Sequence, residues 1–307
     1  MEDYAVKLYQ ITKIYGKQKV IDKVSINVRT GDIYGLVGKN GAGKTTILKL
    51  ISGLIYKTSG SMEILGEVTE SGFNQARRRI GSLIDSPHLY PYFDGRENLE
   101  YYRIQKGLKD KNIVDETLEL VGLNNVDKKK FNKYSLGMKQ RLGIAQAIIG
   151  RPDLLILDEP INGLDPTGIV ELRELLLKIN RELGTTIIVS SHILNEMSLI
   201  ASRYAFIHEG GLIEEVSKGE LEEKCRKYIR LKVDNTEKTV VIFEKELGIQ
   251  DYKVLNNDEI EIYQELNNLN LITKSLIDND IEIKLVTEGA QTLEDYFIKL
   301  IGGDLDA

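Results

Sequence analysis

The sequence predicts an α/β core followed by a smaller α+β module. A glycine-dense loop lies between a strand pattern and a helix pattern near residue 40, and two apolar strand patterns flank an amphipathic helix pattern within 154–191. With 42% hydrophobic residues among 307, the chain can form a core without disulfide or metal staples. Residues 221–307 carry 19 acidic and 11 basic side chains, whereas residues 1–220 carry 28 and 30. We therefore expect two domains, 1–218 and 219–307.

The compartment follows from cysteine usage and hydropathy. The single cysteine, Cys225, excludes an internal disulfide and a four-cysteine zinc site. No apolar run approaches the ~18 residues that a membrane span needs, and the sequence starts without the basic and apolar regions of a signal peptide. We expect a cytoplasmic protein that neither crosses a membrane nor is exported.

The core elements follow from residue type and periodicity. Strands rich in Val, Ile and Tyr are predicted at 4–9, 24–28 and 32–37, and strands buried on both faces of a mostly parallel sheet at 154–157 and 185–191. Apolar residues at helical spacing predict helices at 45–54 and 171–183. The segment 96–149 has helical periodicity and no strand signal, so we expect a helical subdomain at about 90–150.

The strongest functional signal is the sequence GKNGAGKT, which has phosphate-binding loop spacing and lies between a strand and a helix, as such a loop requires. Glycines let backbone N–H groups surround a phosphate, and the helix N-terminus adds positive potential. Lys44 is expected to reach the β- and γ-phosphates of ATP, and Thr45 to ligate Mg²⁺. The residues expected around the nucleotide are Gly38, Asn40, Gly41, Ala42, Gly43, Lys44, Thr45 and Thr46.

A second signal is the apolar strand 154–157, which ends in Asp158 and Glu159. Asp158 is expected to hold Mg²⁺ through its water shell, and Glu159 to orient or deprotonate the attacking water. Many strands end in acids that only cap a helix, but the combination with the glycine loop favours nucleotide hydrolysis.

A third signal is the sequence YSLGMKQR, in which Ser135 and Gly137 precede a helical pattern. It resembles the LSGGQ signature of ABC-type ATPases, with Leu136 and Met138 substituted, and the resemblance covers roughly residues 4–215. The resemblance implies a P-loop NTPase core and a head-to-tail, ATP-dependent homodimer, in which Ser135 and Gly137 contact the γ-phosphate bound to the other subunit. As a bare pattern, the two residues indicate only a helix N-cap.

Further positions resemble this family. Tyr15 lies where an aromatic ring stacks on adenine, although a lone Tyr near a strand end is more often a core residue. Asp165 closes the sequence NGLD, which resembles the loop that contacts the partner subunit. His192 resembles the switch histidine that contacts the γ-phosphate, and the strand before it is expected to end at the same sheet edge as Asp158.

Asp85 departs from the family pattern, which usually has glutamine at this place. The chain more closely resembles exporters of the bacitracin and lantibiotic self-protection type, which often carry an acidic residue there. Asp85 is therefore a candidate Mg²⁺ contact, directly or through water. A turn or helix cap at Asp-Ser-Pro is the alternative.

The acidic part of the chain has its own pattern. Residues 228–286 alternate strand and helix signals in the order β-α-β-β-α-β, which predicts a ferredoxin-like domain, and a closing helix is expected at 291–303. The sequence of this part contains no catalytic pair or basic patch. We expect an accessory module that stabilises a dimer or regulates the core.

The leading hypothesis is an ATP-hydrolysing subunit of an ABC exporter that drives a separate integral membrane permease from the inner face of the membrane. The resemblance implies an antimicrobial peptide, drug or similar amphiphile as cargo. The alternative is a soluble ABC ATPase that acts on nucleic acid or ribosomes. A nucleic-acid partner predicts a strongly basic face, and 28 acidic against 30 basic side chains in residues 1–220 do not supply one.

Overall fold

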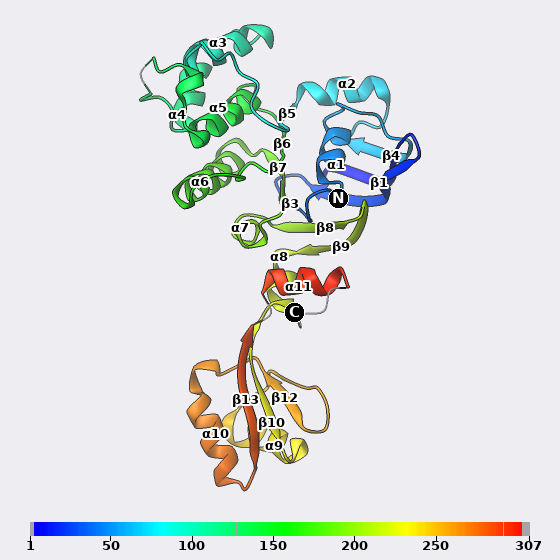
Figure 1. The fold of residues 1–307 in the computed structure, drawn as a ribbon, viewed down its shortest axis with the longest axis vertical. Helices are drawn as coiled ribbons and strands as arrows, with labels where there is room; N and C mark the ends of the chain where they lie inside the picture. Colours follow the sequence, from blue (N-terminus) through cyan, green and yellow to red (C-terminus); the bar gives the residue numbers. More distant parts are fainter. Residues whose placement is uncertain (1–2, 127, 291, 303–307) are drawn as a thin grey trace. The chain divides into compact units, whose positions relative to one another are not determined.

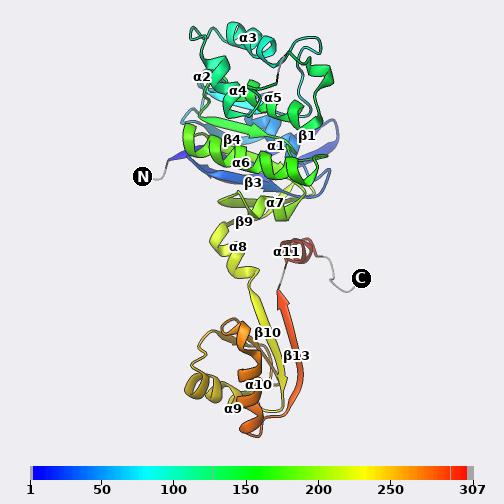
Figure 2. The same ribbon diagram turned by 90° about the vertical axis from the view of Figure 1, so that its left-hand side faces the viewer.

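The computed structural model describes residues 3–126, 128–290 and 292–302. The chain forms two compact units, Met1–Lys218 and Gly219–Ala307, and each has a hydrophobic core of its own. Figures 1 and 2 show the elements of both units in two views.

The first unit is built on a six-stranded sheet. Its strands are β3 (Ile33–Val37), β5 (Ile80–Leu83), β6 (Leu154–Leu157), β7 (Thr186–Ser191), β8 (Arg203–His208) and β9 (Gly211–Ser217). The order is β5-β6-β7-β3-β8-β9, and all neighbours are parallel except β8 and β9. Every residue of β3, β6 and β7 is buried. The predicted parallel core is therefore confirmed.

A second sheet is antiparallel and has the order β2-β1-β4, with β1 at Tyr4–Tyr15, β2 at Gln18–Arg29 and β4 at Ser59–Ile64. The strands predicted at 4–9 and 24–28 are parts of the longer β1–β2 hairpin, which turns at Gly16 with φ of 57°. Register shifts between Leu8 and Ile14 interrupt the alternation of buried and exposed residues. These irregularities explain why the sequence pattern predicted shorter strands.

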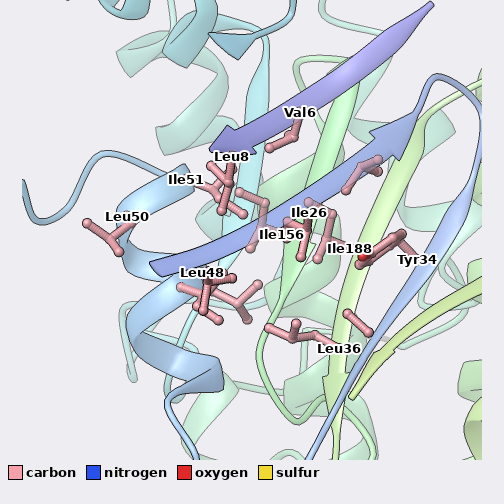
Figure 3. Close-up of a cluster of buried hydrophobic side chains, with 14 of the residues drawn as sticks. Val6, Leu8, Ile26, Tyr34, Leu36, Leu48, Leu50, Ile51, Ile156 and Ile188 are labelled. Carbon is pink, nitrogen blue, oxygen red and sulfur yellow. The ribbon is translucent and has the colours of Figure 1, made fainter. Parts of the chain in front are cut away.

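One hydrophobic core joins the two sheets through helix α1 (Lys44–Ile51), as Figure 3 shows. Leu8 and Ile26 come from the antiparallel sheet, Leu48 from α1, and Ile156 and Ile188 from the parallel sheet; all are at most 2% exposed. Close packing of these side chains holds α1 against the sheet. The glycine loop between β3 and α1 is thereby fixed at the carboxyl edge of the strands.

The remaining helices of this unit are α2 (Glu70–Arg78), α3 (Gly95–Gln105), α4 (Ile113–Leu120), α5 (Leu136–Ile148), α6 (Pro166–Leu183) and α7 (Leu194–Ser198), with a 3-10 turn at Phe131–Lys133. Helices α3, α4 and α5 lie within the segment 90–150 and pack against one another. Asp94 begins α3 with a capping box, in which its side chain accepts from Glu97 N and the Glu97 side chain accepts from Asp94 N. Helix α6 begins earlier than predicted, because Asp165 caps it and Pro166 fits its first turn.

The second unit contains a four-stranded antiparallel sheet with the order β11-β12-β10-β13. Its elements are α8 (Lys218–Lys224), β10 (Lys227–Val233), α9 (Thr236–Ile242), a π-helical turn (Phe243–Leu247), β11 (Tyr252–Val254), β12 (Glu259–Ile262), a 3-10 turn (Leu266–Asn268), α10 (Leu269–Asp278), β13 (Ile283–Ala290) and α11 (Leu293–Leu300). From β10 to β13 the predicted β-α-β-β-α-β order is confirmed, and the sheet order is that of a ferredoxin-like domain.

The predicted closing helix corresponds to α11, while Gln291 and Gly303 at the ends of that prediction lie outside the described residues. Partial burial, followed by the charge of nearby Asp295, raises the pKa of the Cys225 thiol, which makes it a poor nucleophile at neutral pH. Among the described residues, none of the helices combines the length and apolarity that a bilayer crossing requires.

Candidate functional site

The candidate site lies where three parallel strands end. Strand β3 leads into the glycine loop and Lys44, β6 leads into Asp158 and Glu159, and β7 leads into His192. Strand β7 is hydrogen-bonded to both β3 and β6, so the three segments emerge side by side at one edge of the sheet. Ligands of open α/β sheets bind at this edge.

The glycine loop presents backbone rather than side chains. Gly43 precedes α1 with φ of 108°, and no side chain caps the helix there, so the first N–H groups of α1 are available to an anion. Gly41 has φ of 81°, and a Cβ atom placed on it would meet nothing within 4 Å, which indicates open space over the loop. Behind the loop, a Cβ atom on Gly38 would lie 2.3 Å from the Ile207 carbonyl oxygen. The loop therefore packs tightly on one side and is open on the other.

Lys44 is held inside this loop. Its Nζ donates to the carbonyl oxygens of Gly38 at 2.6 Å and Lys39 at 3.2 Å, and the residue is only 5% exposed. Nζ also lies 3.0 Å from Glu159 Oε1. A buried ammonium group in this position places a positive charge beside the free N–H groups of α1, where a polyphosphate is favoured.

Asp158 forms a second centre on the same edge. The hydroxyl of Thr45 donates to Asp158 Oδ2 at 2.7 Å, and Ser190 Oγ donates to Asp158 Oδ1 at 2.6 Å. Asp158 is buried, and its two hydrogen bonds fix the orientation of its carboxylate.

Glu159 is held between Lys44 and His192. Its Oε2 lies 2.6 Å from His192 Nδ1, and its buried Oε1 forms an ion pair of 3.0 Å with Lys44 Nζ. Glu159 has φ of 47°, a left-handed conformation that is costly for a residue with a side chain. The hydrogen bond from Glu159 N to Ser190 Oγ, at 2.9 Å, helps to hold that conformation.

Ser190 is the residue that the sequence analysis missed. It belongs to a run that predicts a buried strand, and its hydroxyl orients Asp158 while accepting from the backbone of Glu159. The signal that could have identified it is a hydroxyl near the end of a buried strand whose neighbour ends in two acids, since β6 and β7 pair Leu157 with Val189.

Replacing Ser190 by Ala is expected to lower the free energy of unfolding by about 1–3 kcal/mol, because it leaves two buried polar groups without partners. We also expect a loss of ATP turnover, because Asp158 and Glu159 lose a common support. Urea denaturation and steady-state ATPase assays measure the two effects. Ser198→Ala, which removes an exposed hydroxyl that donates to the Asn195 carbonyl within its own helix, is the matched control. Turnover equal to the control would contradict this role.

The remaining predicted residues lie on other elements of the first unit. Tyr15 is half-exposed at the end of β1, where Lys13 Nζ lies 4.7 Å from its ring centre, and it pairs with Gln18 at the start of β2. Strand β2 in turn contacts the glycine loop, because a Cβ atom on Gly43 would lie 2.6 Å from Ile21 Cδ1. Tyr15 is therefore on the hairpin beside the loop, with its ring accessible.

Asp85 follows β5, the strand next to β6, and has φ of 65°. Its side chain is 61% exposed and pairs with Lys49 Nζ on α1 at 3.1 Å. Among the hydrogen bonds and ion pairs of the described residues, none joins Asp85 to Thr45 or Asp158. Its direct contact with a metal stays a prediction.

Among the hydrogen bonds and ion pairs of the described residues, none joins Ser135, Gly137 or Asp165 to Lys44, Asp158 or Glu159. Ser135 caps α5 by accepting from Met138 N at 3.3 Å, and Asp165 caps α6 by accepting from Gly168 N at 3.0 Å. Both capping residues are exposed. Both side chains are therefore accessible at the surface of this chain.

A magnesium ion fits the donor set in part. The Thr45 hydroxyl and the Asp158 carboxylate are oxygen ligands of the kind that Mg²⁺ prefers, and they already lie 2.7 Å apart. In the part of the chain that the structure describes, no three His, Cys, Asp or Glu residues gather as a metal cage. The ion would therefore depend on phosphate and water oxygens for its remaining ligands, as is usual for Mg²⁺ in phosphate sites.

Comparison with known proteins agrees with this geometry. The family model "ABC transporter" matches residues 21–162. The chain is 45% identical over 298 residues to the bacitracin transport ATP-binding protein BcrA of Bacillus licheniformis, with 97% of each chain covered. It is 44% identical over 210 residues to the lantibiotic transport ATP-binding protein SrtF of Streptococcus pyogenes, covering 68% of this chain and 90% of that relative. The fold is also similar to a solved dimeric structure of the ATP-binding cassette MJ0796, which is in a post-hydrolysis state and bound to ADP and Pi. The TM-score is 0.62 and the sequence identity 27%, and the match covers 69% of this chain and 98% of that one.

Proposed function

The chain is an ATP-binding subunit of the ABC transporter family and an ATPase, and from this premise we propose that it powers export through a separate membrane permease. ATP hydrolysis at this site is supported above all by one observation: Glu159 contacts both Lys44 and His192 beside an open glycine loop. These groups supply what phosphoryl transfer to water needs, namely fixed positive charge, an oriented base and backbone donors.

The catalytic roles are assigned by chemistry and position. Lys44 neutralises the β- and γ-phosphates, with help from the N–H groups of α1. Glu159 orients the attacking water and accepts its proton, while His192 holds the carboxylate through Nδ1 and lies beside the terminal phosphate. Thr45 and Asp158 would hold Mg²⁺, which supplies charge compensation at the phosphate oxygens when bound. Tyr15 stacks on the adenine ring.

The proposed dimer is supported by the predicted residues for which the described part of the chain shows no hydrogen bond or ion pair with the Lys44 centre of their own chain. Ser135 and Gly137 lie at the start of α5, and Asp165 caps α6. A second copy placed head to tail would bring the α5 N-terminus, with its positive potential, to the γ-phosphate of the first. We propose that ATP holds two copies together in this way, with two shared sites.

The permease is expected to contact the surface that contains Asp85 and the helical subdomain. Large apolar side chains are exposed in this region of the sequence, at Tyr90, Tyr92, Phe93 and Tyr101. Exposed aromatic groups of this kind favour a protein partner. We propose that the subunit sits on the inner face of the membrane, with its second unit stabilising the dimer or regulating the first.

The cargo is proposed from the relatives. BcrA and SrtF are described as transport ATP-binding proteins for bacitracin and for a lantibiotic, so we propose an antimicrobial peptide or a similar amphiphile. The alternative, an ATPase that acts on nucleic acid or ribosomes, is disfavoured by the balanced charge of residues 1–220, with 28 acidic and 30 basic side chains.

Purification of the tagged, full-length chain from membranes of its host tests this proposal. We expect a membrane protein with several spanning helices to be recovered with it, and the ATPase rate to change when the cargo peptide is added. The same chain purified from the cytosolic fraction is the control. Recovery of nucleic acid or ribosomal proteins in place of a membrane protein would contradict the proposal.

A further inference from the structure

The start of α5, at Leu136 and Gly137, packs against the loop before α6. Leu136, one of the two departures from the family signature, is the first residue of α5 and is 50% exposed. Its Cδ2 atom lies 3.1 Å from the position that a Cβ atom on Gly163 would take. The contact is reciprocal, since a Cβ atom on Gly137 would lie 3.8 Å from Leu164 Cδ2. Two leucines and two glycines thus interlock between the start of α5 and the loop before α6.

The loop on the other side of this contact is well fixed. Gly163 has φ of 76°, which a residue with a side chain rarely adopts. Asn162 N donates to Glu159 O at 3.1 Å, and Leu164 N donates to Ile161 O at 3.2 Å, so the loop is tied back to the segment that carries Glu159. A displacement of Leu136 would therefore shift a loop that is hydrogen-bonded to the backbone of Glu159.

A second link lies one turn further along the two helices. Arg141 on α5 forms an ion pair of 3.4 Å with Glu171 on α6, and Arg141 Nε is buried without a hydrogen bond. A half-exposed ion pair of this length contributes little stability. The apolar contact of Leu136 is therefore the better candidate for fixing the local fit.

We propose that Leu136 is a positioning residue: its side chain seats the N-terminus of α5 on Gly163 and Leu164, and so fixes the spacing of Ser135 and Asp165. The inference rests on the proposed function, because the spacing matters only if both residues meet the partner subunit. A glycine at position 136 would leave the space above Gly163 empty and allow the two segments to move independently.

The test compares Leu136→Ala with Leu54→Ala, an equally conservative change at a leucine that is 63% exposed far along the sequence from both segments. We expect kcat to fall roughly tenfold in Leu136→Ala, because small misplacements of positioning groups are costly in catalysis. The affinity of the monomer for ATP should change by less than about twofold, because Lys44 lies on α1 and not on α5. It is measured with a fluorescent nucleotide at protein concentrations that prevent dimer formation. Leu136→Met should restore most of the rate.

A double-mutant cycle with Gly163→Ala tests the contact itself. A methyl group on Gly163 strains the loop and pushes against Leu136, so the loss of rate should be smaller in the Leu136→Ala background than in the wild type. Independent, additive losses would overturn the proposal, as would a wild-type kcat for Leu136→Ala. If the wild-type chain itself hydrolysed no ATP, the proposed function would fail; hydrolysis with an unaffected Leu136→Ala variant would defeat only this inference.

Discussion

Replacing Glu159 by Gln is expected to reduce ATP turnover by about 10²–10⁴-fold, the usual contribution of a positioned general base, while ATP binding is retained. Glutamine preserves the size of the side chain but cannot accept a proton. It also removes the negative charge that lies 3.0 Å from Lys44 Nζ, so the ammonium group becomes freer to meet the phosphates. Two copies that bind ATP and cannot hydrolyse it should accumulate as a closed dimer.

Single-turnover hydrolysis and size-exclusion chromatography with ATP measure these effects. Glu209→Gln is a matched control, because Glu209 has the same φ of 47° and its side chain is 86% exposed. The control should hydrolyse ATP like the wild type and show no ATP-dependent dimer trapping. Normal turnover in Glu159→Gln would remove Glu159 from the role of base.

The sequence was sufficient to predict those parts of the site that follow a strand directly. Asp158 and His192 directly follow predicted apolar strands, and Lys44 follows one after the short glycine loop. Because parallel strands end at one edge of a sheet, their proximity follows from topology. The core strands β6 and β7 were predicted because residues buried on both faces are apolar almost without interruption.

What the sequence did not reveal depends on contacts between distant segments. Ser190 is one hydroxyl in a strand, and its role appears only when the register of β6 against β7 is known. Leu136 looked like a substitution in a signature, and its partner Gly163 lies in a different segment of the chain. The ion pair of Lys49 with Asp85 joins α1 to the segment after β5, which lies more than 30 residues further along the chain. Such pairings have no periodicity that a single sequence can display.

Replacing Lys44 by Ala is expected to weaken ATP binding itself by roughly 30- to 100-fold. A charge-assisted hydrogen bond to phosphate contributes about 2–3 kcal/mol, and each 1.4 kcal/mol corresponds to about a tenfold change in affinity. The free protein changes as well, because the buried Glu159 Oε1 loses the Lys44 ammonium group that lies 3.0 Å from it. The uncompensated carboxylate then repels the γ-phosphate, which adds to the loss.

That repulsion gives the Lys44 prediction a second, sharper test. If Glu159 faces the γ-phosphate, Lys44→Ala should weaken ATP binding more than ADP binding, and Glu159→Gln added to Lys44→Ala should recover part of the ATP affinity. Lys57→Ala, at an exposed lysine beyond α1, should leave both affinities unchanged. Isothermal titration calorimetry with ATP and ADP distinguishes the outcomes. An unchanged ATP affinity in Lys44→Ala would show that the glycine loop does not hold the phosphates, whatever the fold.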